Sequence, residues 1–437
     1  MVLAAKSLMG LLAIALAIPI SAWAQRSSIS KRQYDVAILS AMVGSRIGLF
    51  LVIFVVFKIN PQSDVTVYYD EGRAALNGAV PLVSIQTAYG PLFDYIVAAI
   101  ILVWNSTAAL VLVAVVVEIC SLPIWMRLAR SAFTEAETRV ASALYVLNPL
   151  AISTVVIAGQ NHVGLSLLLA ASLIALMRDR NVLSGMWLGL SAILISFFSL
   201  LFAPILFLKS SQRTAWILSF LMFPIAGYGF VMALGANPLK QVAFHAYDTS
   251  SGNLPYLLSA IGLTLVVPWE RLTADVIAFG VLCSSFIGAV FRLRGLRFSQ
   301  AVLMCAFILL VTMIVSKKAF STYLIIALFP MCLAIAGQAR LRWSVTFFQL
   351  LMALAAIEPS LWFRWLRERE LTLILERVRQ AGVTTAHLLL FLGCEIFLVC
   401  GYAAMLWIVW RAMTEPHRVN RGNPLQVNRS PGPKWRR

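Results

Sequence analysis

The chain has 437 residues, of which 61% are hydrophobic and only 12% charged, and its formal net charge is +17. Soluble domains contain about 25% charged residues, so this composition excludes a soluble globular protein and favours one that lies in a membrane. The basic residues stand in short clusters between apolar runs, a pattern typical of cytoplasmic loops and not of a nucleic-acid-binding face.

The N-terminus allows two interpretations. Residues 1–35 begin with Lys6 in a charged start, followed by an apolar stretch that ends in Ala22-Trp23-Ala24, which resembles a cleavable signal peptide. Arg26, Lys31 and Arg32 follow closely and favour the cytoplasmic side. The segment is therefore predicted to be either a signal-like sequence or an extra helix.

Apolar runs long enough to span a bilayer recur from residue 36 onward. Residues 36–58, 107–126 and 386–410 each reach the roughly 17 to 25 residues that a membrane helix needs. Because backbone polar groups in lipid must be satisfied within the protein, these runs are predicted to be helices. We expect an all-α, polytopic integral membrane protein with about 12 transmembrane helices over residues 36–411.

That number of helices depends on two short segments and one hairpin. Residues 91–104 and 254–267 are too short to cross fully and lie next to prolines, so re-entrant or interfacial helices are expected there. Residues 183–208 are expected to form a tight hairpin. If the two short segments do cross, the basic clusters between them change sides.

Charge divides the connecting segments into two groups. The basic clusters predicted to be cytoplasmic are Lys31/Arg32, Arg127/Arg130, Arg178/Arg180, Lys209/Arg213, Arg292/Arg294/Arg297, Arg340/Arg342 and Arg411. The segments predicted to be external are 60–87, 159–162, 196–199, 235–253, 316–322 and 362–385. The last of these alternates apolar and charged residues at helical spacing, which predicts an amphipathic helix in the membrane interface. Residues 412–437 are basic and rich in Pro, Asn and Gly, so a disordered cytoplasmic tail is expected.

The external segment after the first core helix carries the most informative motif. Its elements are Asp64, Tyr68, Leu76-x-Gly78-x-x-Pro81 and Tyr89-x-Pro91. Further elements follow in order: Leu147-Asn148-Pro149, Gly159-Gln160-Asn161, Ser184-Gly185-x-x-x-Gly189 and Phe320-Ser321-Thr322-Tyr323. In this order the chain resembles, over residues 36–340, the GT-C superfamily of polyprenol-phosphate-sugar-dependent glycosyltransferases, in its bacterial branch related to the GPI mannosyltransferases.

The resemblance implies a transferase in the bacterial inner membrane with its active site facing outside. Its donor would be a polyprenyl-phosphate sugar, with mannose favoured, and its acceptor a glycan or lipid. Such a transfer needs a carboxylate that takes the proton of the acceptor hydroxyl, and cations or donors that hold the departing phosphate. We expect membrane lipids as further partners, no nucleic acid, and no cofactor or metal.

Asp64 suits the role of the base, because it stands where the first core helix meets water. The alternative is a solvated aspartate that caps a helix. Asp70 and Glu71 are second candidates. If the segment is helical, Glu71 returns to the side of Asp64, while Asp70 points elsewhere.

The cations that hold the phosphate are expected on the same external face as Asp64. Lys317 and Lys318 lie on the predicted external side against the charge rule, which suggests a local reason such as a phosphate; headgroup contact is the alternative. His245 lies in a loop that resembles the donor-facing loop of the family. The other expected substrate-binding residues are Tyr68, Arg73, Gln160, His162 and Tyr323.

Two further features bear on this interpretation. Arg46 and Glu118 lie within apolar spans, where a charge facing lipid is costly, so they are expected to pair with each other or with backbone groups. Relatives often carry a lysine after the Gly-x-x-x-Gly helix, and here Ile195-Ser196-Phe197 stands in its place. This protein would need another cation or a different donor.

Two other functions compete with glycosyl transfer. A transporter or flippase of lipid-linked sugars would suit the short broken helices, although no inverted repeat is visible. A polymerase or ligase of the O-antigen type is also polytopic, but its main loop usually comes late in the chain. The absence of a dinucleotide-binding fingerprint favours a lipid-linked donor.

Overall fold

The computed structural model describes residues 2–26, 28–61, 63–239, 250–260, 268–338, 340–365 and 385–415. In these residues the chain is a bundle of helices, and an isolated bridge between Pro81 and Ile85 is the one β-type pairing. The all-α prediction is confirmed. Residues 366–384 and 416–437, which hold most of the expected interfacial helix and of the tail, lie outside the described residues.

The first half of the bundle runs to the hairpin after residue 180. Its elements are α1 (Val2–Arg26), α2 (Lys31–Phe50), the π-helical turn η1 (Leu51–Val56), α3 (Asp64–Leu76), α4 (Phe93–Val103), α5 (Thr107–Ala132), α6 (Glu135–Val146), α7 (Pro149–Ile152), the π-helical turn η2 (Ser153–Ile157), α8 (His162–Met177) and α9 (Asn181–Leu194).

The second half begins with a 3-10 turn. Its elements are η3 (Phe197–Leu201), α10 (Ala203–Lys209), α11 (Arg213–Ala233), α13 (Leu254–Ala260), α14 (Pro268–Leu293), α15 (Phe298–Val315), the 3-10 helix η4 (Ser321–Ala327), α16 (Leu328–Ala336), α17 (Leu341–Trp365) and α19 (Thr385–Thr414).

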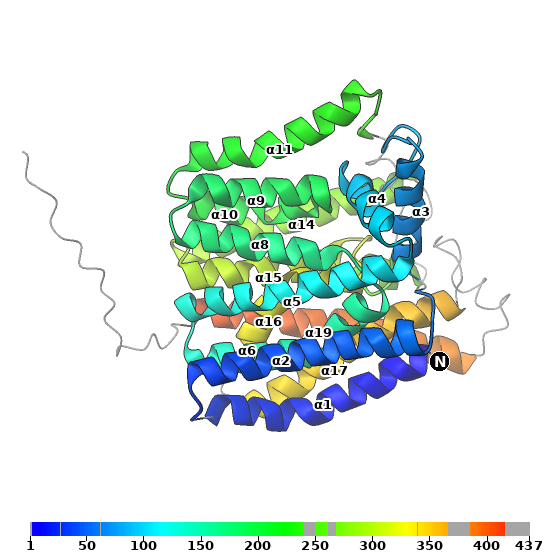
Figure 1. Cartoon of the computed structure of the whole chain (residues 1–437). Coiled ribbons are helices and arrows are strands. Elements are labelled where there is room, and N and C mark those ends of the chain that lie inside the picture. The colour runs from blue at the N-terminus through cyan, green and yellow to red at the C-terminus, as the bar shows by residue number, and fades with distance from the viewer. Residues whose placement is uncertain are drawn as a thin grey trace, which may run out of the picture.

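The long helices lie side by side and run across the view in Figure 1. α3 and α4 stand at one end of the bundle, the end that also holds the N-terminus, whereas the α1–α2 connection lies at the other. α9 packs between α8 and α11, and α15 packs against α19. At the end of the bundle that holds the α1–α2 connection, the basic side chain of Arg130 pairs with the carboxylates of Asp35 and Glu135.

Length and apolarity allow eight of the described helices to cross a membrane: α1, α2 with η1, α5, α11, α14, α15, α17 and α19. α6 and the α7–η2 segment pass the same test together, with a 44° bend at their break, and would make a ninth span. Four shorter apolar segments lie beside these, namely α4, α8, α9 and η4–α16. The predicted dozen spans requires several of these shorter segments to cross as well.

The structure describes residues 91–104 and 183–208 in full, and whether 91–104 and 254–267 are re-entrant or interfacial stays a prediction. α4 lies next to α3 at the end of the bundle, and the chain returns from there into α5. The expected hairpin is formed by α9, the turn at Ser196, and η3 with α10. Of the other short segment only α13 is described, because residues 261–267 lie outside the described ranges.

The helix at the N-terminus is packed into the bundle. α1 lies along α17 and α6, and Gly10 allows close contact: a Cβ there would be 2.9 Å from the Cβ of Ala353. Lys6 reaches α17, where its ammonium donates to the carbonyl of Ala356 over 2.9 Å. Both interpretations of residues 1–35, a signal-like sequence and an extra helix, stay predictions.

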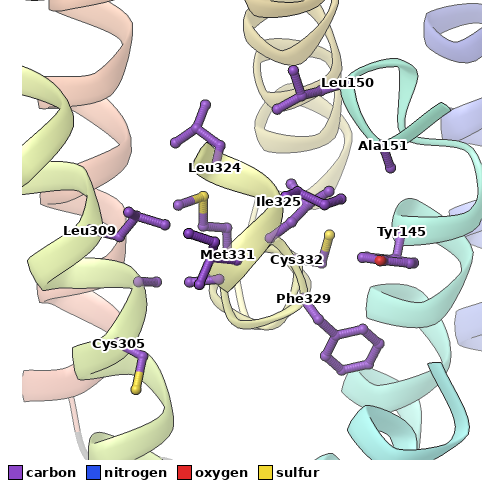
Figure 2. Close-up of a cluster of buried hydrophobic side chains, with 14 of the residues drawn as sticks. Tyr145, Leu150, Ala151, Cys305, Leu309, Leu324, Ile325, Phe329, Met331 and Cys332 are labelled. Carbon is purple, nitrogen blue, oxygen red and sulfur yellow. The ribbon is translucent and has the colours of Figure 1, made fainter. Parts of the chain in front are cut away.

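The centre of the bundle is an apolar core around η4 and α16. Figure 2 shows side chains of these two segments between α15 on one side and α6 and α7 on the other. Phe329 stacks on Trp125 at 5.8 Å between ring centroids and lies 5.9 Å from Tyr145. Burial of these rings fixes the register of α16 against α5 and α6, because large aromatic side chains dominate core packing.

The predicted pairing of the two intramembrane charges is confirmed. The Arg46 guanidinium makes two hydrogen bonds to the Glu118 carboxylate, Nε to Oε2 at 3.0 Å and Nη2 to Oε1 at 3.1 Å. Its Nη1 donates to the carbonyl of Val146 over 3.0 Å. Both side chains are fully buried. The geometry is the bidentate fork that arginine makes with carboxylates, and it ties α2 to α5 and α6.

The Gly-x-x-x-Gly motif of α9 allows a close helix crossing. A Cβ at Gly185 would overlap the carbonyl oxygen of Trp216, and a Cβ at Gly189 would overlap that of Phe220. Small residues four apart let two membrane helices approach until their backbones touch. α9 and α11 are therefore held by backbone contact along this stripe.

We expect Gly189→Ala to lower the free energy of unfolding by about 1 to 3 kcal/mol, because the new methyl group must push α11 away. Thermal unfolding of the detergent-purified chain measures the effect. Gly229→Ala is the matched control, since Gly229 lies on α11 with open space where a Cβ would stand. Equal melting temperatures for the two variants would contradict the close crossing.

Candidate functional site

Five of the six segments predicted to be external meet at the end of the bundle that holds α3. The side chain of Gln160 reaches Ser63 and Asp64, and the rings of Phe198 and His162 pack on Tyr323. The backbone N–H of Ser250 donates to the carbonyl of Lys317 over 2.8 Å. These contacts join residues as far apart in the sequence as His162 and Tyr323 into one polar and aromatic surface.

Local backbone irregularities set the two central residues in place. α2 ends in the π-helical turn η1, after which Lys58 adopts a left-handed φ of 51° and the chain turns into α3. The second π-helical turn, η2, ends just before Gly159, whose φ is 59°. π-helical turns are rare and are frequent at functional sites. Here one leads to Asp64 and the other to Gln160.

Asp64 is the first residue of α3, behind the extended residue Ser63. Its carboxylate is half-buried and lies at the N-terminal, positive end of the helix dipole. Gln160 Nε2 donates to Asp64 Oδ2 and to Ser63 Oγ, each over 3.1 Å. Gln160 therefore orients the carboxylate from one side.

The other end of the Gln160 amide is also engaged. Its Oε1 accepts a hydrogen bond of 3.2 Å from the Tyr68 hydroxyl, one turn along α3 from Asp64. Burial and the nearby charge of Asp64 raise the pKa of Tyr68 well above its usual value, so the phenol stays a donor. Because a phenol donates and a carboxylate accepts, the two neighbours specify the orientation of the amide.

Aromatic rings form the wall around this network. Tyr68 meets Tyr89 edge-on at 4.8 Å and Phe93 at 5.1 Å. Tyr323 packs in the same way on His162 at 4.7 Å. The phenol of Tyr323 is close enough to affect the pKa values of Tyr68 and Tyr89, so the two groups of rings belong to one site.

The loop that carries Tyr89 is held to α9 through its backbone. Gly90 N–H donates to the carbonyl of Ile195, and Leu92 N–H to that of Ile193, each over 3.1 Å. A Cβ at Gly90 would overlap the Ile193 carbonyl oxygen. Glycine is required by this close approach, which places Tyr89 over Tyr68.

The structure places beside the site a carboxylate that the sequence motifs do not indicate. Asp94, in the first turn of α4, is buried and shares the Thr87 hydroxyl with Glu71, at 3.5 Å and 3.3 Å. Burial and then the charge of Asp94 raise the pKa of Glu71 to about 8, and burial raises that of Asp94 to about 6. The signal in the sequence was a lone carboxylate at the start of an apolar run, which lipid would not tolerate unpaired.

The predicted positions of Asp70 and Glu71 on the helix that begins at Asp64 are confirmed. Glu71 lies on the side of Asp64 and feels its charge. Asp70 and Arg73 are exposed, and the Arg73 guanidinium lies 5.8 Å from the centre of the Tyr69 ring.

The side chains predicted to bind the phosphate, Lys317, Lys318 and His245, differ in their surroundings. Lys317 is buried, and its ammonium lies 2.6 Å from the Asp275 carboxylate of α14, which accounts for a cation at this position. The Lys318 N–H donates to Ser316 Oγ over 3.3 Å. His245 lies outside the described residues. A phosphate-binding role for these residues stays a prediction.

Comparison with known proteins yields structural similarity only. No protein-family profile matches the chain, and no curated protein matches its sequence. The chain is similar to the oligosaccharyltransferase of Archaeoglobus fulgidus in its apo form, with a TM-score of 0.37 and 11% identity over 90% of this chain and 57% of that one. For the complex of the same protein with zinc and sulfate the TM-score is 0.36, with 13% identity over 85% of this chain and 52% of that one. The chain thus spans little more than half the length of the solved structures it matches.

The raised pKa values at Glu71 and Asp94 predict how stability depends on pH. The folded chain binds protons here more tightly than the unfolded chain does, so the free energy of unfolding falls as pH rises through about 6 and about 8. Glu71→Gln is expected to flatten this part of the profile, because it removes one of the two titrating groups. Thermal unfolding across this pH range measures the slope.

Asp70→Asn is the matched control, since Asp70 is the adjacent, exposed carboxylate. It should leave the slope unchanged. A Glu71→Gln variant with the wild-type slope would show that Glu71 does not bind a proton more tightly in the folded chain.

Proposed function

We propose that the chain is a membrane glycosyltransferase that moves a sugar from a polyprenyl-phosphate donor to a glycan or lipid acceptor, and that Asp64 is its general base. The carrying observation is the orientation of the Asp64 carboxylate by Gln160 at the end of the bundle, beneath a wall of aromatic rings. The order of sequence motifs that resembles GT-C enzymes supports the same proposal and favours mannose and an active site facing outside.

The chemistry follows from the two oxygens of Asp64. Gln160 binds Oδ2, and we assign Oδ1 to the acceptor hydroxyl. The carboxylate takes the hydroxyl proton while the hydroxyl oxygen bonds to the anomeric carbon and the bond from that carbon to the phosphate oxygen breaks. The neutral Tyr68 phenol and the Gln160 amide hold the base without taking the proton themselves.

The surroundings suit the two parts of the donor. Aromatic faces such as those of Tyr89 and Tyr323 pack well on sugar rings and prenyl chains, since they offer rigid apolar area with a polar tip. The departing phosphate needs a cation. Lys318, Arg73 and His245 are the candidates, whereas a phosphate at Lys317 would have to compete with Asp275.

A transporter or flippase of lipid-linked sugars is the second candidate. The observation that favours it is the 44° break between α6 and the α7–η2 segment, because discontinuous helices build the binding sites of many transporters. Helix α3, which begins at Asp64, stands however at the end of the bundle and not halfway along it (Figure 1). Transfer of labelled sugar by the purified chain would decide between the two.

Asp64→Asn is expected to lower kcat/KM for transfer from a labelled polyprenyl-phosphate sugar by about a hundredfold or more, because the amide cannot accept the proton. The control is Glu415→Gln, which removes a carboxylate at the far end of α19. Equal transfer by Asp64→Asn and wild type would refute the base assignment. If wild type itself transfers no mannose, glucose, galactose or arabinose, the transporter gains support.

Gln160 is a positioning residue under this proposal, and its variants should change the pH profile. Gln160→Glu sets a second carboxylate against Asp64, which disfavours the ionised base, so the acid limb of the pH–rate profile should move to higher pH. Gln160→Leu removes the donor without adding charge, so it should lower kcat with a smaller displacement in the same direction. A merely structural role would lower both rates and leave the profile in place.

A further inference from the structure

A second polar cluster lies inside the bundle, where α1, α17 and α19 meet the segment before α13. It consists of Lys6, Ser251, Gly252, Glu358 and Glu395. The three helices are among those long and apolar enough to span a membrane. Glu358 is 1% exposed, Glu395 0% and Lys6 8%. Ionisable groups so placed are costly and are by default functional.

The carboxyl groups of Glu358 and Glu395 both accept hydrogen bonds from the segment before α13. The Ser251 hydroxyl donates to Glu358 Oε1, and the Gly252 N–H donates to Glu395 Oε2 over 2.6 Å. Gly252 has a left-handed φ of 80°, which favours glycine. The two glutamates lie close enough for each to influence the charge of the other. The segment is thereby fastened to α17 and α19 at once.

The cluster contains one fewer positive than negative charge when all groups are ionised. Lys6 is the one cation, and its ammonium is held by the Ala356 carbonyl and Ser360 Oγ, each at 2.9 Å. Two adjacent carboxylates in a low-dielectric interior repel, and only one of them is neutralised by the lysine. One additional unit of positive charge would make the cluster neutral.

Buried polar atoms without hydrogen-bond partners indicate where this additional positive charge would bind. Within the described residues, Glu395 Oε1 is buried and has no hydrogen-bond donor. The Tyr402 hydroxyl is fully buried, also has no hydrogen-bond partner there, and is close enough to feel both glutamates. Buried polar atoms of this kind require an explanation, such as a bound proton or ion.

We propose that Glu358 and Glu395 form a proton-binding site that holds a single shared proton within the bundle. With the proton bound, one carboxylate and the Lys6 ammonium balance, and the segment 250–253 docks between the helices. The same segment contacts the Lys317 carbonyl through Ser250, so the proton site supports the outer end of the bundle. The proposal does not depend on glycosyl transfer.

Among the described residues, the other groups that face the pair contribute no competing charge at neutral pH. α19 supplies Cys394 and Tyr402, and α13 supplies Tyr256, which packs on Phe391. The segment 250–253 supplies neutral hydroxyl and amide groups. Lys317, at the end of α15, is directed to Asp275. Lys6 on α1 is the charge that sets the balance.

Infrared spectroscopy tests the site through the C=O stretching band of a protonated carboxylic acid. The full chain is used in a Glu71→Gln, Asp94→Asn background, which removes the acid of the other carboxylate pair. At neutral pH we expect one buried acid per chain, and its loss in Glu395→Gln and in Glu358→Gln, because the remaining carboxylate pairs with Lys6. Glu415→Gln is the control and should keep the band.

Lys6→Met provides an independent readout in the opposite direction. Removal of the ammonium should add a second acid and about double the band, since both carboxyl groups must then be neutral. A background protein with no acid band would overturn the proposal. A melting temperature that rises with Na⁺ or K⁺ at fixed pH and ionic strength would assign the charge to a metal ion and would overturn it equally.

Discussion

The ion pair between Arg46 and Glu118 is the contact on which the arrangement of the site depends. It joins α2 to α5, and its third hydrogen bond, to the Val146 carbonyl, adds the end of α6. Both side chains are fully buried, so neither can shift along its helix without leaving a charge unpaired in a low-dielectric interior. The pair thus fixes the axial register of three helices.

Those three helices deliver the parts of the candidate site. α2 continues through η1 to Asp64, and α6 continues through Asn148, α7 and η2 to Gln160. The hydrogen bonds from Gln160 to Asp64 and Tyr68 require the two helix ends to stand at matching height. A slip of one turn, about 5.4 Å along either helix, would break both. The ion pair inside the bundle therefore determines the positions of Asp64 and Gln160 at its end.

Two pairs of carboxyl groups within the described part of the chain differ in their surroundings. Glu71 and Asp94 share the Thr87 hydroxyl at the end of the bundle, within reach of the Asp64 charge. Glu358 and Glu395 lie among long apolar helices, beside Lys6. The first pair adjusts the charge around a candidate base, whereas the second fastens a segment between helices. The same repulsion between like charges operates in both, and the surroundings decide what it does.

Much of the fold could be predicted from the sequence alone. Apolar length specified helices because lipid offers the backbone no partners, and the cost of buried charge specified that Arg46 and Glu118 pair. Helical periodicity separated Glu71 from Asp70, and the spacing of Gly185 and Gly189 marked the close crossing of α9 and α11. These are local properties, or properties of single helices against a uniform solvent.

Only the tertiary structure decided which polar groups meet. The Gln160 bridge to Asp64, the Asp94 partner of Glu71, the Asp275 partner of Lys317 and the Glu358–Glu395 cluster each join residues from separate elements. Their pairing depends on the order in which the helices pack and on their axial register. Neither is encoded in the hydrophobic period, because many orders bury the same apolar area, and the side-chain contacts that select one of them come from residues far apart in the chain.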